Sequence, residues 1–161
     1  METSKVEICQ LASVAYRYTM RFKEFVNESV YYHGTTPETA HLILQNGIDV
    51  SKYKSGMFQG FYLAPDLSYF TNPNPRRSVI LACDVDESKL MDVKSITDKD
   101  LEEAYPGFKR MSYAYHNHLI TQIAKKRGYY GLHNGHEIII LDPKAVRSIN
   151  VVSASAASHQ A

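Results

Sequence analysis

One short stretch, Tyr31 to Thr36 (YYHGTT), most constrains what this chain can fold into. Its tyrosines favour a β-strand, which we predict over residues 29–33. The threonines that close the stretch supply an N-cap for a helix predicted over residues 37–45, with proline at its first position and glutamate in its first turn. His33 and Gly34 then lie at the mouth of a strand-to-helix turn, where a glycine lets a ligand approach the backbone. An ordinary turn with an exposed histidine is the alternative.

Composition indicates an ordinary globular protein. The chain has 161 residues, of which 44 % are hydrophobic and 22 % are charged, enough for one domain with a real core. The formal net charge of +1 gives no global electrostatic reason to bind nucleic acid or a membrane. Twelve tyrosines suit strands, and their rings can stack on flat ligands while the hydroxyl forms a hydrogen bond.

Cysteine spacing and hydropathy limit the cellular setting. Cys9 and Cys83 are far apart and form no CxxC pair, which argues against a disulfide framework or a zinc ribbon. The first residues show no signal peptide, and no run approaches the about 18 apolar residues that suggest a membrane span. We therefore expect a monomer without a membrane partner, located in the cytoplasm of the producing cell or, for an effector, of a host.

Hydrophobic periodicity and helix breakers predict the other elements. The first is an amphipathic helix over residues 4–26. Many short strands and few long helices predict one α+β domain over residues 1–152, with a split, mostly antiparallel sheet and flanking helices. Residues 153–161 are small and polar, and we expect a disordered tail there. The remaining predictions are strands over 60–64, 78–85, 89–93, 129–132 and 137–141, short helices over 65–70 and from 97 to before 106, and a long helix over 110–127.

Three motifs follow one another along the chain. The first is His33-Gly34-Thr35, the second is Gly60-Phe61-Tyr62-Leu63-Ala64 after a glycine-bounded loop, and the third is Glu137 opening the apolar run Ile138 to Leu141. In this order they resemble the ADP-ribosyltransferase superfamily, specifically the His-Tyr-Glu branch shared by diphtheria-toxin-like and poly(ADP-ribose)-polymerase-like enzymes. The resemblance covers residues 29–152, and the closing segment also looks like that of bacterial and phage members.

The resemblance implies the ADP-ribosyltransferase fold and an NAD-dependent mono-ADP-ribosyltransferase, with NAD as its substrate and no metal. Such an enzyme cleaves the bond between nicotinamide and ribose and transfers ADP-ribose to a macromolecular acceptor, here expected to be protein, as bacterial or phage effectors and toxins do. Nucleic acid and small molecules remain open as acceptors. Bond cleavage passes through an oxocarbenium-like centre, as in glycoside cleavage, so the site needs a carboxylate near the developing positive charge.

The same resemblance assigns residues of all three motifs to the part of NAD that contains nicotinamide and its ribose. His33 contacts a ribose hydroxyl, and the backbone of Gly34 pairs with the nicotinamide amide, with Thr35 beside them. The catalytic residues are Glu137, His33 and Tyr62, of which Glu137 hydrogen-bonds the ribose and stabilises the oxocarbenium. Without the family pattern, Glu137 reads as an exposed carboxylate at a strand end, although a charge opening an apolar strand needs an explanation.

The resemblance assigns the nicotinamide slot to the second motif. Tyr62 stacks on nicotinamide, and Tyr69 closes the other face, with Phe70 as the second choice. Ser68 reaches the nicotinamide amide, and the loop over residues 51–59 lies where the family places its lid over the donor site. The alternative for Tyr62 is an ordinary core tyrosine in a strand.

Departures from the family pattern narrow the subfamily. Gly135 stands two residues before Glu137, so the Glu-x-Glu or Gln-x-Glu of the Arg-Ser-Glu toxin branch is absent, as is a Ser-Thr-Ser at the second motif. The N-terminal ~28 residues are too short for a large helical regulatory domain, which favours single ADP-ribose units over polymers.

Two other functions stay open at this stage. A catalytically idle module that binds NAD or a protein is one, although His33, Tyr62 and Glu137 are all present. An RNA 2′-phosphotransferase is the other, but it would need a histidine in the second strand and a set of arginines. Four histidines make a zinc site conceivable, yet their spacing matches no clean ligand pattern: His116, His118, His133 and His136.

Overall fold

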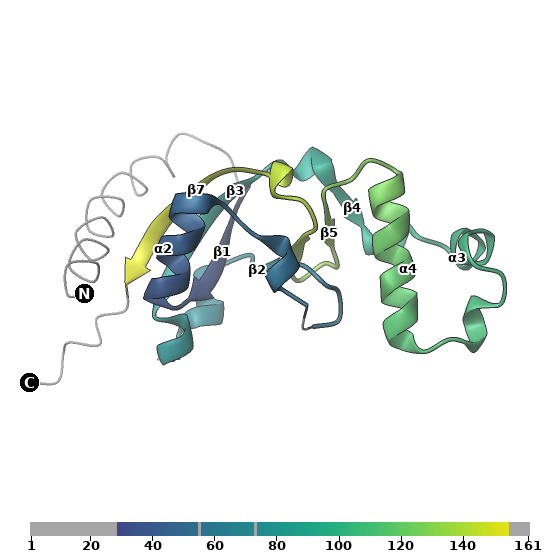
Figure 1. Ribbon diagram of the computed structural model, residues 1–161, viewed down its shortest axis with the longest axis horizontal. Helices are drawn as coiled ribbons and strands as arrows, with labels where there is room; N and C mark the ends of the chain where they lie inside the picture. The colour runs from purple at the N-terminus through teal and green to yellow at the C-terminus, as the bar shows by residue number, and fades with distance from the viewer. Residues whose placement is uncertain (1–28, 55, 73, 155–161) are drawn as a thin grey trace, which may run out of the picture. The chain divides into compact units, whose positions relative to one another are not determined.

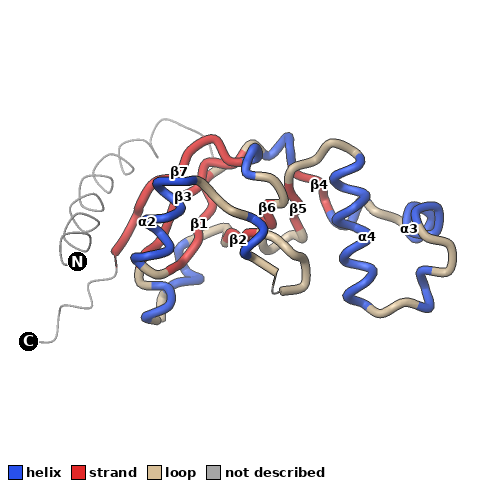
Figure 2. The backbone as a smooth tube through the Cα atoms, viewed as in Figure 1, coloured by secondary structure: helices blue, strands red, loops and turns tan. Residues whose placement is uncertain are grey.

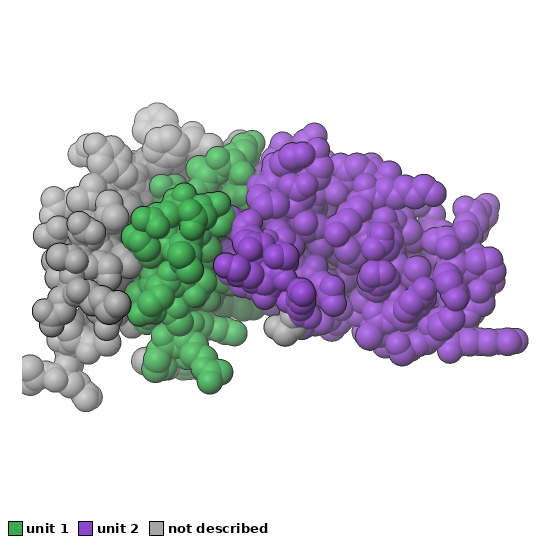
Figure 3. Space-filling model, viewed as in Figure 1, with its two compact units in different colours: residues 1–47, 64–85, 146–161 green, residues 48–63, 86–145 purple. Residues whose placement is uncertain are grey.

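The computed structural model describes residues 29–54, 56–72 and 74–154. The N-terminal helix predicted over residues 4–26 lies outside these ranges. The chain divides into two compact units, coloured separately in Figure 3. The first, unit 1, contains residues 1–47, 64–85 and 146–161, and the second, unit 2, contains residues 48–63 and 86–145.

Unit 1 is built on a three-stranded antiparallel sheet with strand order β1-β3-β7. Figure 1 labels its strands, β1 (Val30–Thr35), β3 (Val79–Val85) and β7 (Val146–Ala154). The central strand, β3, is almost entirely apolar, and its side chains Val79, Leu81, Cys83 and Val85 are fully buried. Because β3 pairs along both edges, burying these side chains supplies most of the core of the unit.

Helix α2 (Pro37–Asn46) covers the same sheet through contacts with β3 and β7. Thr36 is its N-cap, since the side chain accepts a hydrogen bond from the backbone N–H of Thr39. Ala40 and Ile43 form its buried face, and the helix ends at Gly47, whose φ is 80°. The predicted helix over residues 37–45 is confirmed to within one residue.

Unit 2 contains a four-stranded sheet with strand order β2-β6-β5-β4. Its strands, red in Figure 2, are short: β2 (Phe61–Leu63), β4 (Leu90–Asp92), β5 (Gly131–His133) and β6 (Ile138–Ile140). The pairs β2–β6 and β5–β6 are antiparallel, whereas β4 and β5 are parallel. The register aligns Tyr62, Ile139, Leu132 and Met91 across the four strands, so these side chains share one face of the sheet.

Helices α3 (Asp98–Ala104) and α4 (Tyr113–Lys126) complete unit 2. On α4, Ala124 packs on the shared face of the sheet with Ile139, while Leu119 and Ile123 pack against Leu101 of α3 and Phe108. The helix begins later than the predicted residue 110, because Phe108–Arg110 form a 3₁₀ turn and Ser112 caps the first turn of α4.

The α+β class and the mostly antiparallel pairing are confirmed. Pairing with β3 explains two of the boundaries that differ from the prediction. Strand β1 continues through Thr35, because Gly34 and Thr35 pair with Ile80 and Val79. Strand β7 includes Ser153 and Ala154, which we had placed in the tail but which pair with the same two residues of β3. None of the helices in the described ranges is long and apolar enough to cross a membrane.

Candidate functional site

Tyr62 of strand β2 and Glu137, the residue just before strand β6, lie near each other in unit 2. Tyr62 pairs with Ile139, and Glu137 stands two residues before Ile139. Continuing the alternation of β6 by one residue puts the Glu137 side chain on the side of the Tyr62 ring. Electrostatics reflect this proximity. Burial raises the pKa of the Tyr62 phenol, the hydrogen bond from the Phe58 backbone opposes that rise, and the negative charge of Glu137 adds to it.

The backbone of Glu137 is positioned by Asn134, a residue that the sequence analysis did not single out as functional. The side-chain oxygen of Asn134 accepts hydrogen bonds from the backbone N–H groups of His136 at 3.0 Å and of Glu137 at 2.9 Å. Gly135 between them has a φ of 91°. An Asn-Gly pair is a strong turn signal, and the sequence contains it one residue apart from Glu137, with His136 between them.

The Tyr62 hydroxyl is hydrogen-bonded to the loop over residues 51–59, which we predicted to be the lid over the donor site. It accepts a hydrogen bond from the Phe58 backbone N–H at 2.7 Å and donates one to the Phe58 carbonyl at 2.9 Å. Gly56, with a φ of 116°, lies so close that a Cβ there would be 3.1 Å from the Tyr62 hydroxyl oxygen. The Tyr62 ring also packs against the hydrophobic core. Tyr62 therefore has the structural role that we weighed as the alternative to nicotinamide stacking.

The first motif lies within strand β1, and not in the strand-to-helix turn that we predicted. His33 pairs with Leu81 and is half-buried, whereas the Thr35 side chain is buried. The backbone N–H and C=O of Tyr32 bond to Ala64, at 2.9 and 2.7 Å, on the edge of β1 that faces away from β3. Because backbone groups alternate along an antiparallel strand, those of Gly34 point to the same edge.

Gly34 is in close contact with the segment that follows the second motif. A Cβ on Gly34 would lie 2.7 Å from Cε1 of Phe70 and 3.0 Å from Cβ of Arg77. Tyr69, our first choice for the second aromatic residue, is 46 % exposed. Phe70, our second choice, is therefore the one of these two aromatic residues that contacts Gly34. It does so because residues 67–70 form a 3₁₀ turn.

Ser68 is engaged locally at the start of this 3₁₀ turn. Its backbone N–H donates to the Asp66 carboxylate at 2.8 Å, and its hydroxyl donates to the same carboxylate oxygen. These hydrogen bonds lower the pKa of Asp66. In this arrangement Asp66 caps the turn, and the Ser68 hydroxyl that we predicted to reach nicotinamide is bonded to that cap.

The predicted site residues thus fall into two groups. Unit 2 brings Tyr62 and Glu137 together, and unit 1 holds the residues of the first motif and of the 3₁₀ turn: His33, Gly34, Thr35, Ser68 and Tyr69. Within the described ranges, no group of three or more His, Cys, Asp or Glu side chains could hold a metal ion. His116, one of the four histidines considered for zinc, has its Nε2 2.7 Å from the Phe108 carbonyl oxygen.

No protein-family model matches the chain, and no curated protein matches it. A functional assignment has to rest on the residues and on their geometry within each unit.

Proposed function

We propose that the chain is an NAD-dependent mono-ADP-ribosyltransferase. The observation that carries this proposal is the proximity of Tyr62 and Glu137 in unit 2, where the charge of Glu137 acts on the Tyr62 phenol. An aromatic ring beside a carboxylate is the combination that cleavage of the nicotinamide–ribose bond requires. The ring offers a stacking surface for nicotinamide, and the carboxylate favours positive charge on the ribose.

The chemistry is a substitution at the anomeric carbon of the nicotinamide ribose. The bond from this carbon to the nicotinamide nitrogen breaks, and nicotinamide leaves with the electron pair. A nucleophilic atom of the acceptor forms the new bond to carbon and gives up its proton. Because the transition state is oxocarbenium-like, we assign Glu137 to stabilising it and His33 to a ribose hydroxyl.

The edge of β1 supports a role for Gly34 in binding. Its backbone N–H and C=O point to the edge at which Tyr32 pairs with Ala64. An N–H donor and a C=O acceptor side by side complement the amide group of nicotinamide.

Incubation with labelled NAD tests the proposal. The chain is mixed with a cell lysate and NAD labelled in its adenylate phosphate, and free nicotinamide and macromolecule-bound label are both measured. We expect nicotinamide release together with transfer of label to macromolecules. Digestion of the labelled fraction with protease or with nuclease then identifies the acceptor class, which we expect to be protein. Absence of nicotinamide release in any lysate would refute the enzymatic proposal.

One observation favours a second candidate, a module that binds NAD or a protein without catalysis. The Tyr62 hydroxyl is engaged by both backbone groups of Phe58, and its ring packs against core residues, so a structural role alone explains its environment. The same experiment separates the two candidates. Saturable NAD binding without nicotinamide release would favour the binding module.

A further inference from the structure

Helix α4 presents a third face besides the two that pack in the core of unit 2. This face carries Ala114, Asn117, Thr121 and Lys125, spaced three or four residues apart, so they lie on one side of the helix. Together with loop residues from the described ranges 50–54 and 56–59, it lines a pocket of about 470 Å³. We call this cavity the α4 pocket. Its volume lies within the range of small-molecule sites, about 300–1,000 Å³.

The loop wall of the α4 pocket is held in place from two sides. The buried amide of Asn117 donates a hydrogen bond to the Met57 carbonyl at 3.0 Å, and the Tyr62 hydroxyl bonds the backbone of Phe58. The hydroxyl of Thr121 is also buried and donates to the Asn117 carbonyl at 3.0 Å. These contacts hold Met57, Phe58 and the facing turn of α4 in place, which lowers the cost of ordering this part of the pocket on binding.

The lining has the character of an anion site. It includes Lys54, Lys125 and the imidazole of His118, and none of the described residues that line it is acidic. Asp49, which lies next to this loop, already bonds Ser51 at 3.1 Å and pairs with Lys52 at 3.9 Å. The positive charge of the pocket is therefore not neutralised by its own lining.

The pocket also offers apolar and aromatic surface. Tyr53, Phe58 and Leu141 contribute to its lining, and the Tyr53 ring is fixed edge-on against Phe61 at a centroid distance of 5.0 Å. A rigid aromatic side chain next to cations suits a ligand that combines a flat ring with a phosphate group. Neither Tyr62 nor Glu137 is among the lining residues.

We propose that the α4 pocket binds a small organic phosphate that carries a flat ring, with Lys54 and Lys125 supplying the positive charge. Neither Tyr62 nor Glu137 lines this site, although one of its walls is the loop that we predicted as the donor-site lid, and binding there does not require the proposed transferase activity. A free mononucleotide is the simplest ligand of this class. The Tyr53 side of the pocket accommodates its ring.

The test uses adenosine monophosphate (AMP) as the probe on the full chain. In a heteronuclear NMR titration we expect saturable shifts at the amides of Tyr53, Phe58 and Lys125. Adenosine should bind more weakly than AMP, because it lacks the phosphate, and inorganic phosphate should compete with AMP. Failure of AMP to saturate at millimolar concentration would overturn the proposal, and so would equal binding of adenosine.

Charge variants provide the matched comparison. We expect Lys125→Glu to weaken AMP binding about tenfold or more, Lys125→Arg to retain it, and Lys54→Ala to weaken it about two- to fivefold, the range of an exposed charge contact. Lys126→Glu is the control, since Lys126 neighbours Lys125 on α4 but does not line the pocket. An equal loss in Lys126→Glu would show nonspecific attraction and overturn the site.

The wild-type titration keeps the test decisive if a variant fails to fold. Shifts that cluster at Tyr62 and Glu137, with none at Tyr53 or Lys125, would mean that AMP binds as a fragment of NAD. That result would overturn the α4 pocket while supporting the proposed transferase. Nicotinamide release, measured without AMP, reports on the transferase alone, so the two proposals can fail independently.

Discussion

The phenolic oxygen of Tyr62 lies 2.7 Å from the backbone nitrogen of Phe58 and 2.9 Å from its carbonyl oxygen. One side chain in strand β2 thus satisfies both polar backbone groups of a loop residue four positions earlier. The Phe58 side chain is itself buried among Met91, Leu132 and Ile139. The position of the loop is therefore coupled to Tyr62, the residue that we assign to nicotinamide.

Tyr62→Phe separates the hydroxyl from the ring. The substitution removes both hydrogen bonds to Phe58 and keeps the stacking surface. We expect the free energy of unfolding to fall by about 1–3 kcal/mol, because two part-buried backbone groups lose their partner. NAD affinity should change less in this variant than in Tyr62→Ala, for which we expect a loss of about 1–3 kcal/mol. Denaturant unfolding and NAD titration measure the two quantities.

Tyr113→Phe is the control for the hydroxyl, because Tyr113 is 69 % exposed on α4, and its stability should match that of the parent chain. An unchanged unfolding free energy in Tyr62→Phe would contradict the structural role of the hydroxyl. An unchanged NAD affinity in a folded Tyr62→Ala chain would remove the stacking assignment.

Gly34→Ala tests the close contact in unit 1. The added methyl group would lie 2.7 and 2.9 Å from two ring atoms of Phe70, distances that force the ring or the strand to move. Overpacking of this kind costs about 1–3 kcal/mol of stability. If nicotinamide pairs with the backbone of Gly34, NAD affinity should also fall, by about tenfold, since a displaced strand edge loses that pairing.

A double variant distinguishes the two effects in Gly34→Ala. Phe70→Leu makes room for the methyl group, so stability should return in the combined variant and the two changes should be non-additive. Restored stability with NAD affinity still reduced would place the Gly34 backbone at the ligand. NAD affinity equal to that of the parent chain in Gly34→Ala itself would contradict the assignment.

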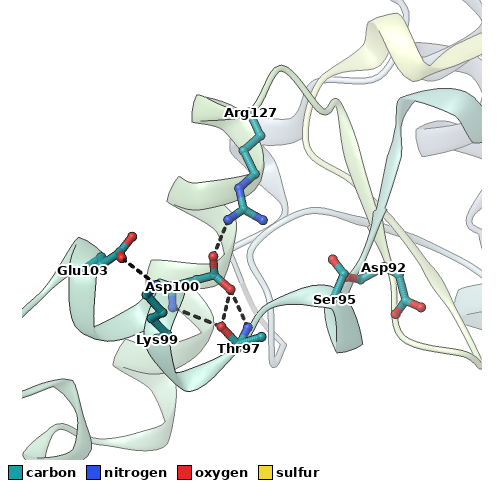
Figure 4. Close-up of polar contacts among 7 residues, drawn as sticks. All are labelled: Asp92, Ser95, Thr97, Lys99, Asp100, Glu103 and Arg127. Atoms are coloured by element: carbon teal, nitrogen blue, oxygen red, sulfur yellow. Dashed lines mark hydrogen bonds and ion pairs between the residues drawn. The ribbon is translucent and has the colours of Figure 1, made fainter.

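Asp100 gives unit 2 a pH-dependent contribution to stability. Its carboxylate accepts hydrogen bonds from the hydroxyl and backbone N–H of Thr97, at 2.6 and 2.7 Å, and from Arg127 at 2.6 Å (Figure 4). These hydrogen bonds lower the pKa of Asp100 from 3.8 to about 2. The bond from the Thr97 hydroxyl has the largest effect, followed by the Thr97 backbone N–H and then by Arg127. A lowered carboxyl pKa stabilises the folded state above the unfolded value, and that contribution is lost as the pH falls through the folded value.

Asp100→Asn should therefore be less stable than the parent chain at neutral pH. The difference should persist down to about pH 4 and shrink towards zero as the pH falls through about 2. Thermal unfolding at a series of pH values measures it. Glu103→Gln is the control, because Glu103 forms an exposed pair with Lys99 at 3.8 Å, and exposed pairs contribute little. A constant difference between Asp100→Asn and the parent chain down to pH 2 would contradict this account.

The elements that the sequence predicted well are those whose signals are local. Thr36 with Pro37 marked the start of α2, and Thr97 with Asp100 marked that of α3, because N-caps and capping boxes involve residues three positions apart. The end of β1 was predicted less well, since Gly34 and Thr35 are extended by pairing with Ile80 and Val79, which no local pattern contains.

The candidate site shows the same difference between features with local sequence signals and features that depend on distant contacts. Tyr62 and Glu137 were named from short motifs, and the structure brings them close enough for the charge of Glu137 to act on the Tyr62 phenol. The two hydrogen bonds between the Tyr62 hydroxyl and the Phe58 backbone could not be predicted, because they depend on how the loop returns to the sheet. The contact between Gly34 and Phe70 depends likewise on the packing of a 3₁₀ turn.

Glu137→Gln is the sharpest test of catalysis, because it keeps the shape of the side chain and removes its charge. The hydrogen bond from the Glu137 backbone N–H to Asn134 holds the chain position in either form. A carboxylate that stabilises positive charge on the ribose acts mainly in the transition state. We therefore expect the transfer rate to fall on the order of 10²-fold or more while NAD affinity changes little.

Single-turnover transfer and NAD titration on the same preparation measure these two effects separately. Glu38→Gln is the matched control, since Glu38 is an exposed carboxylate in the first turn of α2 and its loss should leave the transfer rate unchanged. A folded Glu137→Gln chain with near-normal transfer would exclude Glu137 as the catalytic residue. An NAD affinity that falls as far as the rate would instead assign Glu137 to ground-state binding, because the lost interaction would then be equally strong before and during bond cleavage.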